Sequence, residues 1–178
     1  MEFRVVDFEI VTHHYKKYQD GVQKIEDYKS EILKKVDPIR KEMQGIISAA
    51  QSGIVVDNLN EQQRMQRFQS LQQELVNIDK DAKVQITEMR DQMTKEVYAE
   101  LEEMISNWSI SNNINVVIGK LEVVYVSEEY NITDVVLDML KAKGESVEEE
   151  DTVEYKGDLE RQLKKEKEQK VIIEQEGE

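Results

Sequence analysis

The 178-residue sequence has no cysteine, and it has only one proline and seven glycines. Without cysteine there is no thiol nucleophile, and the chain is compatible with either an oxidising or a reducing compartment. No stretch approaches the roughly 18 consecutive apolar residues of a membrane-spanning helix, so we predict no direct membrane insertion. Basic side chains are in deficit, with 24 Lys and Arg against 38 Asp and Glu and a net charge of -14. Because such a surface repels phosphate groups, we predict no nucleic acid partner.

Sequence signatures of catalysis are missing as well. There is no glycine-rich phosphate loop and no Gly-x-Ser-x-Gly elbow. The acidic stretch at Asp79 and Asp81 lacks the glycine and the final glutamate of a calcium loop. The only two histidines, His13 and His14, are adjacent near an expected helix start, and neighbours on one helix cannot face the same metal. We therefore predict that the protein is not an enzyme and uses no cofactor or metal.

The sequence does contain two long helical patterns, at residues 15–51 and 57–108. In the first, apolar residues recur at alternating steps of three and four, which is the heptad of a coiled-coil seam. In the second, most steps are four, so we expect the two helices to pack well near one end and to splay elsewhere. The first stripe consists of Val22, Ile25, Lys29, Ile32, Val36, Ile39, Met43, Ile46 and Ala50. The second consists of Leu71, Leu75, Ile78, Ala82, Ile86, Met89, Met93, Val97, Leu101, Met104 and Trp108.

A reversal between these helices predicts an antiparallel hairpin over residues 15–108, roughly 50 Å long, with its tip near residues 51–58. Gly53 permits the turn, and Asp57 or Asn58 can cap the next helix. The only proline, Pro38, falls inside the first helix and predicts a kink near residues 34–38, with Gly45 as a second soft point. A stable helix that tolerates both residues is the alternative.

The hairpin tip is apolar where a solvated turn should be polar. Ile54, Val55 and Val56 are therefore candidates for contact with a client or partner protein, and local packing against Ile46 and Leu59 is the alternative. Methionines along the arms suit a surface that adapts to many shapes, although they also fill ordinary coiled-coil seams. The candidate contact residues are Met43, Ile46, Ile47, Ile54, Val55, Val56, Met65 and Phe68.

Residues 1–14 and 109–144 predict a small body outside the arms. Residues 4–8 predict one strand, and residues 114–118 and 121–126 predict a hairpin that turns at Gly119 and Lys120. A short helix follows, with Asn131 as its cap and Gly144 as its stop. The predicted fold class is therefore α+β, with long antiparallel helical-hairpin arms projecting from a small β body, a short C-terminal helix and a charged tail.

Such a body is too small for an independent core. Three strands and one short helix bury too little apolar area to offset the entropy lost on ordering the chain. We therefore expect an obligate oligomer. Its shared core should contain Val5, Val117, Val124 and Val136.

Residues 145–178 form an acidic tail with 13 acidic and 6 basic side chains. Residues 159–170 are compatible with a polar helix, and residues 171–173 with a short apolar segment. Disorder of the whole tail is one expectation. The other is docking on a partner through Leu159, Leu163, Val171, Ile172 and Ile173.

The order of strand, helical hairpin, strand pair and short helix resembles the Skp (OmpH-like) periplasmic chaperones over residues 3–143. The resemblance is carried by the apolar stretch from Asn115 to Val126, and by the helix start Asn131-Ile132-Thr133-Asp134 with the Val/Leu-rich helix after it. It implies a homotrimer whose sheets form a central body and whose arms enclose unfolded polypeptide without ATP. The well-known family members are strongly basic, whereas this chain is acidic.

Two functions fit these patterns. The first is an ATP-independent trimeric holdase that cages unfolded client polypeptides between helical arms. The second is a non-enzymatic structural or assembly protein, for example a phage particle component, that uses the same fold to bind fixed partners. The resemblance implies a periplasmic location. The first residues enter the predicted strand with no signal peptide, which leaves cytoplasmic and virion-associated locations open.

Overall fold

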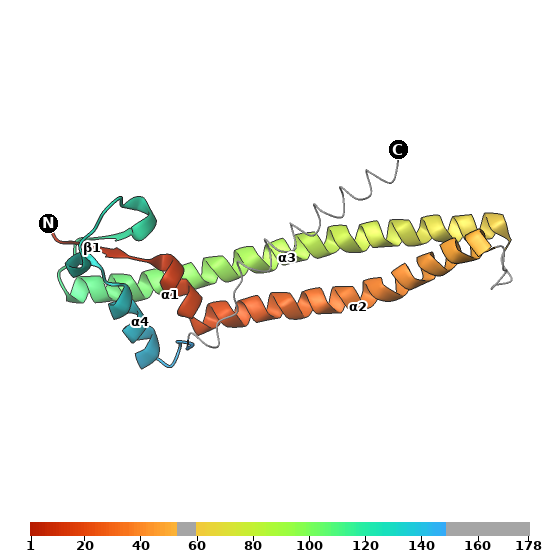
Figure 1. Ribbon diagram of the computed structural model, residues 1–178. Coiled ribbons are helices and arrows are strands. Elements are labelled where there is room, and N and C mark those ends of the chain that lie inside the picture. Colours follow the sequence, from red (N-terminus) through yellow and green to blue (C-terminus); the bar gives the residue numbers. More distant parts are fainter. Residues whose placement is uncertain (53–59, 149–178) are drawn as a thin grey trace.

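The computed structural model describes residues 1–52 and 60–148, and one long helical hairpin dominates its outline (Figure 1). Strand β1 (Phe3–Val6) and helix α1 (Phe8–His14) precede helix α2 (Lys16–Ser52), and helix α3 (Glu61–Ser111) returns to the body. Strand β2 (Val116–Gly119), the single-turn 3-10 helices η1 (Lys120–Glu122) and η2 (Glu128–Tyr130), and helix α4 (Thr133–Ala142) follow. The α+β prediction, with long antiparallel helices beside a small strand pair, is confirmed.

Helix α3 begins at a capping box built from Asn60 and Gln63. The Asn60 side chain accepts from the Gln63 N–H at 2.8 Å, and the Gln63 side chain accepts from the Asn60 N–H at 2.9 Å. These two bonds satisfy donors that the first turn of a helix leaves unpaired. The sequence predicts the cap at Asp57 or Asn58, which lie outside the described residues. The structure places it later, at Asn60.

The predicted stripes of both helices face the seam between them. Val22 and Ile25 near the body and Leu71 near the tip are each 1% exposed, and Val36, Ile39 and Ala82 between them are buried as well. The seam is therefore packed along its length, and the prediction that the helices splay away from one end is wrong. At the tip the buried residue is Ala49, not the predicted Ala50.

Helix α2 continues through Pro38 without interruption. Its distal part turns toward α3 (Figure 1). Pro38 itself is exposed, so the hydrogen bond that proline removes lies on the solvent side of the helix.

The core of the body lies where the last turns of α3 meet β1, α1 and α4. It is larger than the sequence predicts, because α1 and α3 both contribute buried side chains to it. Its residues are Val6, Val11, Tyr15, Val97, Leu101, Ile105, Ile132, Val136 and Leu140.

The strand pairing differs from the prediction. β2 pairs with β1 in parallel, with Phe3 opposite Val116 and Val6 opposite Gly119, and the predicted hairpin of residues 114–118 with 121–126 is wrong. Val123 has an extended backbone, with φ -122° and ψ 129°, but residues 123–126 join no strand. An alternating apolar pattern predicts an extended chain and does not specify its partner, and here the N-terminal segment occupies the edge of β2.

The first strand ends at Val6, two residues earlier than predicted, because Asp7 caps α1. The Asp7 side chain accepts from the Ile10 N–H at 3.2 Å. His13 and His14 consequently lie in the last turn of α1 rather than at a helix start. Gly144 follows α4 with φ +69°, as predicted for the residue that stops this helix.

None of the described helices is long and apolar enough to cross a membrane.

Candidate functional site

The distal end of the hairpin contains a groove of about 540 Å³. Met65 is 57% exposed there and Ile47 is 44% exposed, so the groove presents apolar surface to solvent. Ile46, Ile47, Met65 and Phe68 were all predicted from the sequence as contact residues, and the structure brings them together. The groove is lined by Ile46, Ile47, Ala49, Ala50 and Gln51 of α2, and by Glu61, Arg64, Met65 and Phe68 of α3.

The other predicted contact residues are placed differently. Met43 is half-buried and does not line the groove. Ile54, Val55 and Val56 lie outside the described residues, as do all five predicted docking residues of the tail. The polar rim of the groove, Gln51, Glu61 and Arg64, was missed, although the spacing of Arg64 four residues before Phe68 would have placed both on one helix face.

An ion pair fastens the two helices beside the groove. Arg67 donates from Nε to one oxygen of Glu42 at 2.6 Å and from its terminal nitrogen to the other oxygen at 2.9 Å. This two-point contact lowers the pKa of Glu42 and raises that of Arg67, because the hydrogen bonds favour both charged forms. The pair links the two helices that form the groove, but both side chains are nearly half exposed, so its contribution to stability is small.

At the opposite end, the root of the hairpin is fastened by a second polar cluster. The Tyr15 hydroxyl donates to Glu100 of α3, and Lys17 contacts both Glu96 and Glu100. The hydrogen bond from Lys17, with that from Tyr15, holds the pKa of Glu100 below its usual range. Burial, with the bond to Glu100, raises the pKa of the Tyr15 phenol.

The chain after α4 bridges the break between α1 and α2. The Lys16 N–H donates to the Glu145 carbonyl at 2.8 Å, and the Val147 N–H donates to the His14 carbonyl at 2.9 Å. These bonds satisfy one free donor at the start of α2 and one free acceptor at the end of α1. We call residues 145–147 the splint, and they fix the point from which the tail leaves the body.

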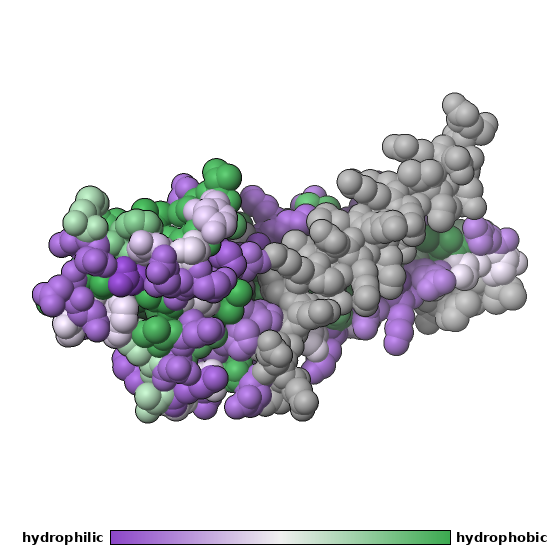
Figure 2. Space-filling view, turned by 60° about the vertical axis from the view of Figure 1, so that its left-hand side comes forward, coloured by the Kyte–Doolittle hydropathy of each residue, from purple (hydrophilic) through white to green (hydrophobic). Residues whose placement is uncertain are grey.

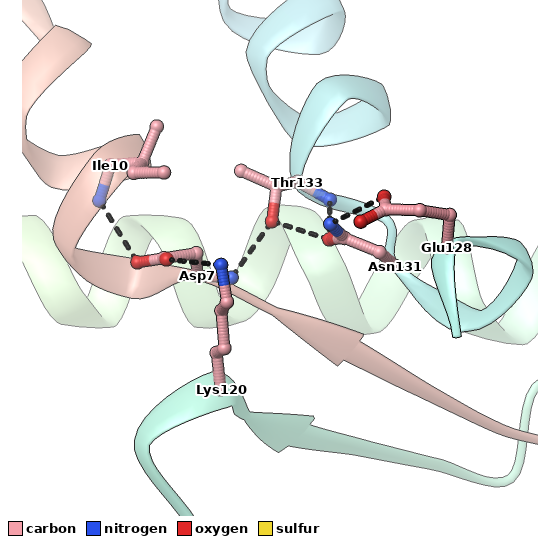
Figure 3. A network of polar contacts seen from close by, with 6 residues as sticks. All are labelled: Asp7, Ile10, Lys120, Glu128, Asn131 and Thr133. Carbon is pink, nitrogen blue, oxygen red and sulfur yellow. Dashed lines mark hydrogen bonds and ion pairs between the residues drawn. The ribbon is translucent and has the colours of Figure 1, made fainter. Parts of the chain in front are cut away.

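A polar network ties the start of α1 to α4 and to η1 (Figure 3). The Asp7 N–H donates to the Thr133 hydroxyl at 2.9 Å, and that hydroxyl donates to the Asn131 side chain at 2.7 Å. The predicted cap at Asn131 is wrong by one residue, because Ile132 occupies the cap position, but the Asn131 side chain still accepts from the Thr133 N–H at 3.1 Å. Lys120 pairs with Asp7 at 3.2 Å, which fixes the beginning of the segment that follows β2.

That segment carries three strongly exposed apolar side chains. Leu121, Val124 and Tyr125 are 89%, 105% and 83% exposed, and Figure 2 shows hydrophobic surface gathered over the body. We call these three residues the body patch. Of the predicted oligomer-core residues, Val124 lies in this patch and Val117 is half-buried against the core. Val5 and Val136 are completely buried within one chain, so their burial does not require a second copy.

Among the described residues, no cluster of three or more His, Cys, Asp or Glu side chains could hold a metal ion. The two adjacent histidines make different contacts. The His14 ring contacts the Ile10 carbonyl at 2.9 Å through Nδ1, and the His13 carbonyl accepts from the Gln19 side chain at 2.6 Å.

Comparisons with known proteins agree with the topology described above. The family described as "Outer membrane protein (OmpH-like)" matches residues 2–140. The fold is similar to the crystal structure of an OmpH-like protein from Caulobacter crescentus CB15, which is described as an outer membrane chaperone. The TM-score is 0.59 and the sequence identity is 13%, and the match covers 82% of this chain and 87% of that chain. No curated protein matches at a significant level. The family match covers most of the sequence, and the chain therefore belongs to the OmpH-like family.

Proposed function

We propose that this protein is an ATP-independent holdase, a chaperone that binds unfolded polypeptide and keeps it from aggregating. The observation that carries the proposal is the apolar groove at the end of the hairpin, far from the body core. Ile47 and Met65 expose apolar surface in it, and methionine adapts to side chains of many shapes. The description of the Caulobacter relative as a chaperone supports the same function.

We further propose that three copies assemble through the body. The body patch exposes three large apolar side chains next to β2, and such a surface is typical of an interface between chains. Assembly through the body would leave the three tip grooves at the ends of separate arms. A client segment could then be held at several grooves at once, which strengthens weak individual contacts.

Two substitutions in the groove test the holdase proposal. Ile47→Asp and Met65→Asp place charge on the apolar walls, and both side chains are partly exposed already, so the fold should tolerate them. The matched controls are Val76→Asp and Val84→Asp, because these residues are 60% and 52% exposed on α3 but do not line the groove. Light scattering of a chemically unfolded client, diluted into buffer with each variant, reports suppression of aggregation.

We expect the groove double variant to lose at least tenfold in suppression per mole while both controls keep it. Equal suppression by the groove variant and the controls would refute client binding at the tip. If the unmodified protein suppresses no aggregation at all, the alternative role as a structural or assembly protein with fixed partners is favoured instead.

A further inference from the structure

The groove lies between two helix segments that are not acidic, in a chain that is acidic overall. Residues 33–52 carry four basic and two acidic side chains, and residues 61–80 carry three of each. Residues 149–178, in contrast, carry eleven acidic and six basic side chains. Taken as a whole, the tail is therefore opposite in charge to the distal arm, and its acidic side chains lie on both sides of residues 161–170, which carry five basic and two acidic side chains.

The tail also contains one apolar segment that matches the groove in chemistry. Val171, Ile172 and Ile173 are consecutive, and Glu174, Glu176 and Glu178 follow them. An apolar triplet followed by carboxylates suits a groove with apolar walls that adjoins the net positive segment 33–52, and the rim of this groove carries Arg64 together with Glu61.

The point at which the tail leaves the body allows this segment to reach the groove. The bond from the Val147 N–H to the His14 carbonyl fixes the chain at the start of α2, and Ile47 lies 31 residues further along that helix. At 1.5 Å per residue the groove is about 46 Å away. The 23 residues from Glu148 to Val171 can span up to about 75 Å when extended.

We propose that the segment Val171–Ile172–Ile173 docks in the tip groove of its own chain and competes there with unfolded polypeptide. The competition with unfolded polypeptide rests on the proposed holdase function. The docking of the segment does not depend on that function. A tethered segment has an effective concentration in the millimolar range. With an intrinsic dissociation constant of about 0.1 mM, it would leave roughly one groove in ten free.

The methyl group of Met65 reports on docking directly, because Met65 lines the groove and the other methionines do not. In full-length protein with labelled methionine methyl groups, the Ile172→Asp variant should shift the Met65 resonance and leave that of Met104, at the root of the hairpin, unchanged. The matched control is Val153→Asp, which adds the same charge to an apolar tail position that is not among the predicted docking residues. It should leave Met65 unchanged.

Three outcomes decide the proposal. A Met65 shift in Ile172→Asp alone supports it, and about a tenfold gain in client affinity of that variant supports the competition. An unchanged Met65 resonance overturns docking, whether or not the protein suppresses aggregation. A Met65 shift caused by Val55→Asp but not by Ile172→Asp also overturns it, since the groove would then be occupied by the residues that join the two helices.

Discussion

Two glycines inside α2 offer a direct test of how closely the hairpin packs. A Cβ atom built on Gly45 meets nothing within 4 Å, whereas one built on Gly21 would lie 2.3 Å from Sδ and 2.6 Å from Cγ of Met93. Replacing a helix-interior glycine by alanine gains about 1 kcal/mol from backbone entropy. Gly45→Ala should therefore raise the free energy of unfolding by about that amount.

At Gly21 the same gain is opposed by the cost of moving Met93. Overpacking a contact of this kind costs about 1–3 kcal/mol, and the flexible thioether keeps the cost toward the lower end. Gly21→Ala should thus be between neutral and about 2 kcal/mol destabilising, and the two variants should differ by about 1–3 kcal/mol.

Urea unfolding at one fixed protein concentration measures this difference, because any association makes the midpoint depend on concentration. Helical circular dichroism and the fluorescence of the single tryptophan, Trp108, give two signals for the same transition. If Gly21→Ala stabilises the protein as much as Gly45→Ala does, the close approach of α2 to α3 at Met93 is not present in solution. In a double-mutant cycle, Met93→Ala should cost less in the Gly21→Ala background than in the unmodified protein, since the two residues are in contact.

Three further predictions follow from the root and the body. Val124→Asp should lower the native mass of the assembly at micromolar concentration, and Val84→Asp on the arm should not; an unchanged mass would remove the body patch from the interface. Because the Lys17 contact holds the pKa of Glu100 below its usual 4.5, the stability it contributes is present above that pH and is lost as the pH falls through the lowered pKa. Urea midpoints of Glu100→Gln should accordingly fall less between pH 6 and pH 3 than those of the unmodified protein, and parallel pH profiles would contradict this. Val147→Pro removes the N–H that donates to the His14 carbonyl, and it should speed hydrogen exchange in the first turn of α2 by about tenfold relative to Val147→Ala. Equal exchange rates in the two variants would show that the splint does not stabilise the break between α1 and α2.

The helical part of this fold could be predicted because its signal is local. The stripes from Val22 to Ile46 and from Leu71 to Trp108 repeat over many turns, and each turn adds to the same periodicity. The caps were harder to place, since Asp57, Asn58 and Asn60 are all good cap residues. Asn58 has Glu61 and Asn60 has Gln63 at the spacing of a capping box, so the sequence does not decide between them.

The strand pairing could not be predicted, because it depends on residues far apart in the sequence. Val116 and Val123 both favour an extended chain, but nothing local indicates that Phe3 pairs with the first and that the second remains unpaired within the chain. The splint was missed for a related reason. Its contacts to His14 and Lys16 use backbone atoms, so side-chain identity at residues 145–147 carries no signal for them. The groove was half predicted, since its apolar walls are visible in the sequence and its rim depends on how the two helices align.

The parallel pairing of β1 with β2 has a consequence for the order in which the protein folds. Phe3 and Val116 are separated by more than a hundred residues, and closing so long a loop as free chain is entropically costly and slow. The hairpin between them needs only contacts between neighbouring turns and between two adjoining helices, which form quickly. Once α2 and α3 are paired, β1 and β2 are already brought together, and the effective loop is short. During synthesis β1 therefore cannot pair with β2 until the whole hairpin and residues 116–119 have left the ribosome. The paired arms then bring the two strands together, so the body forms after the hairpin.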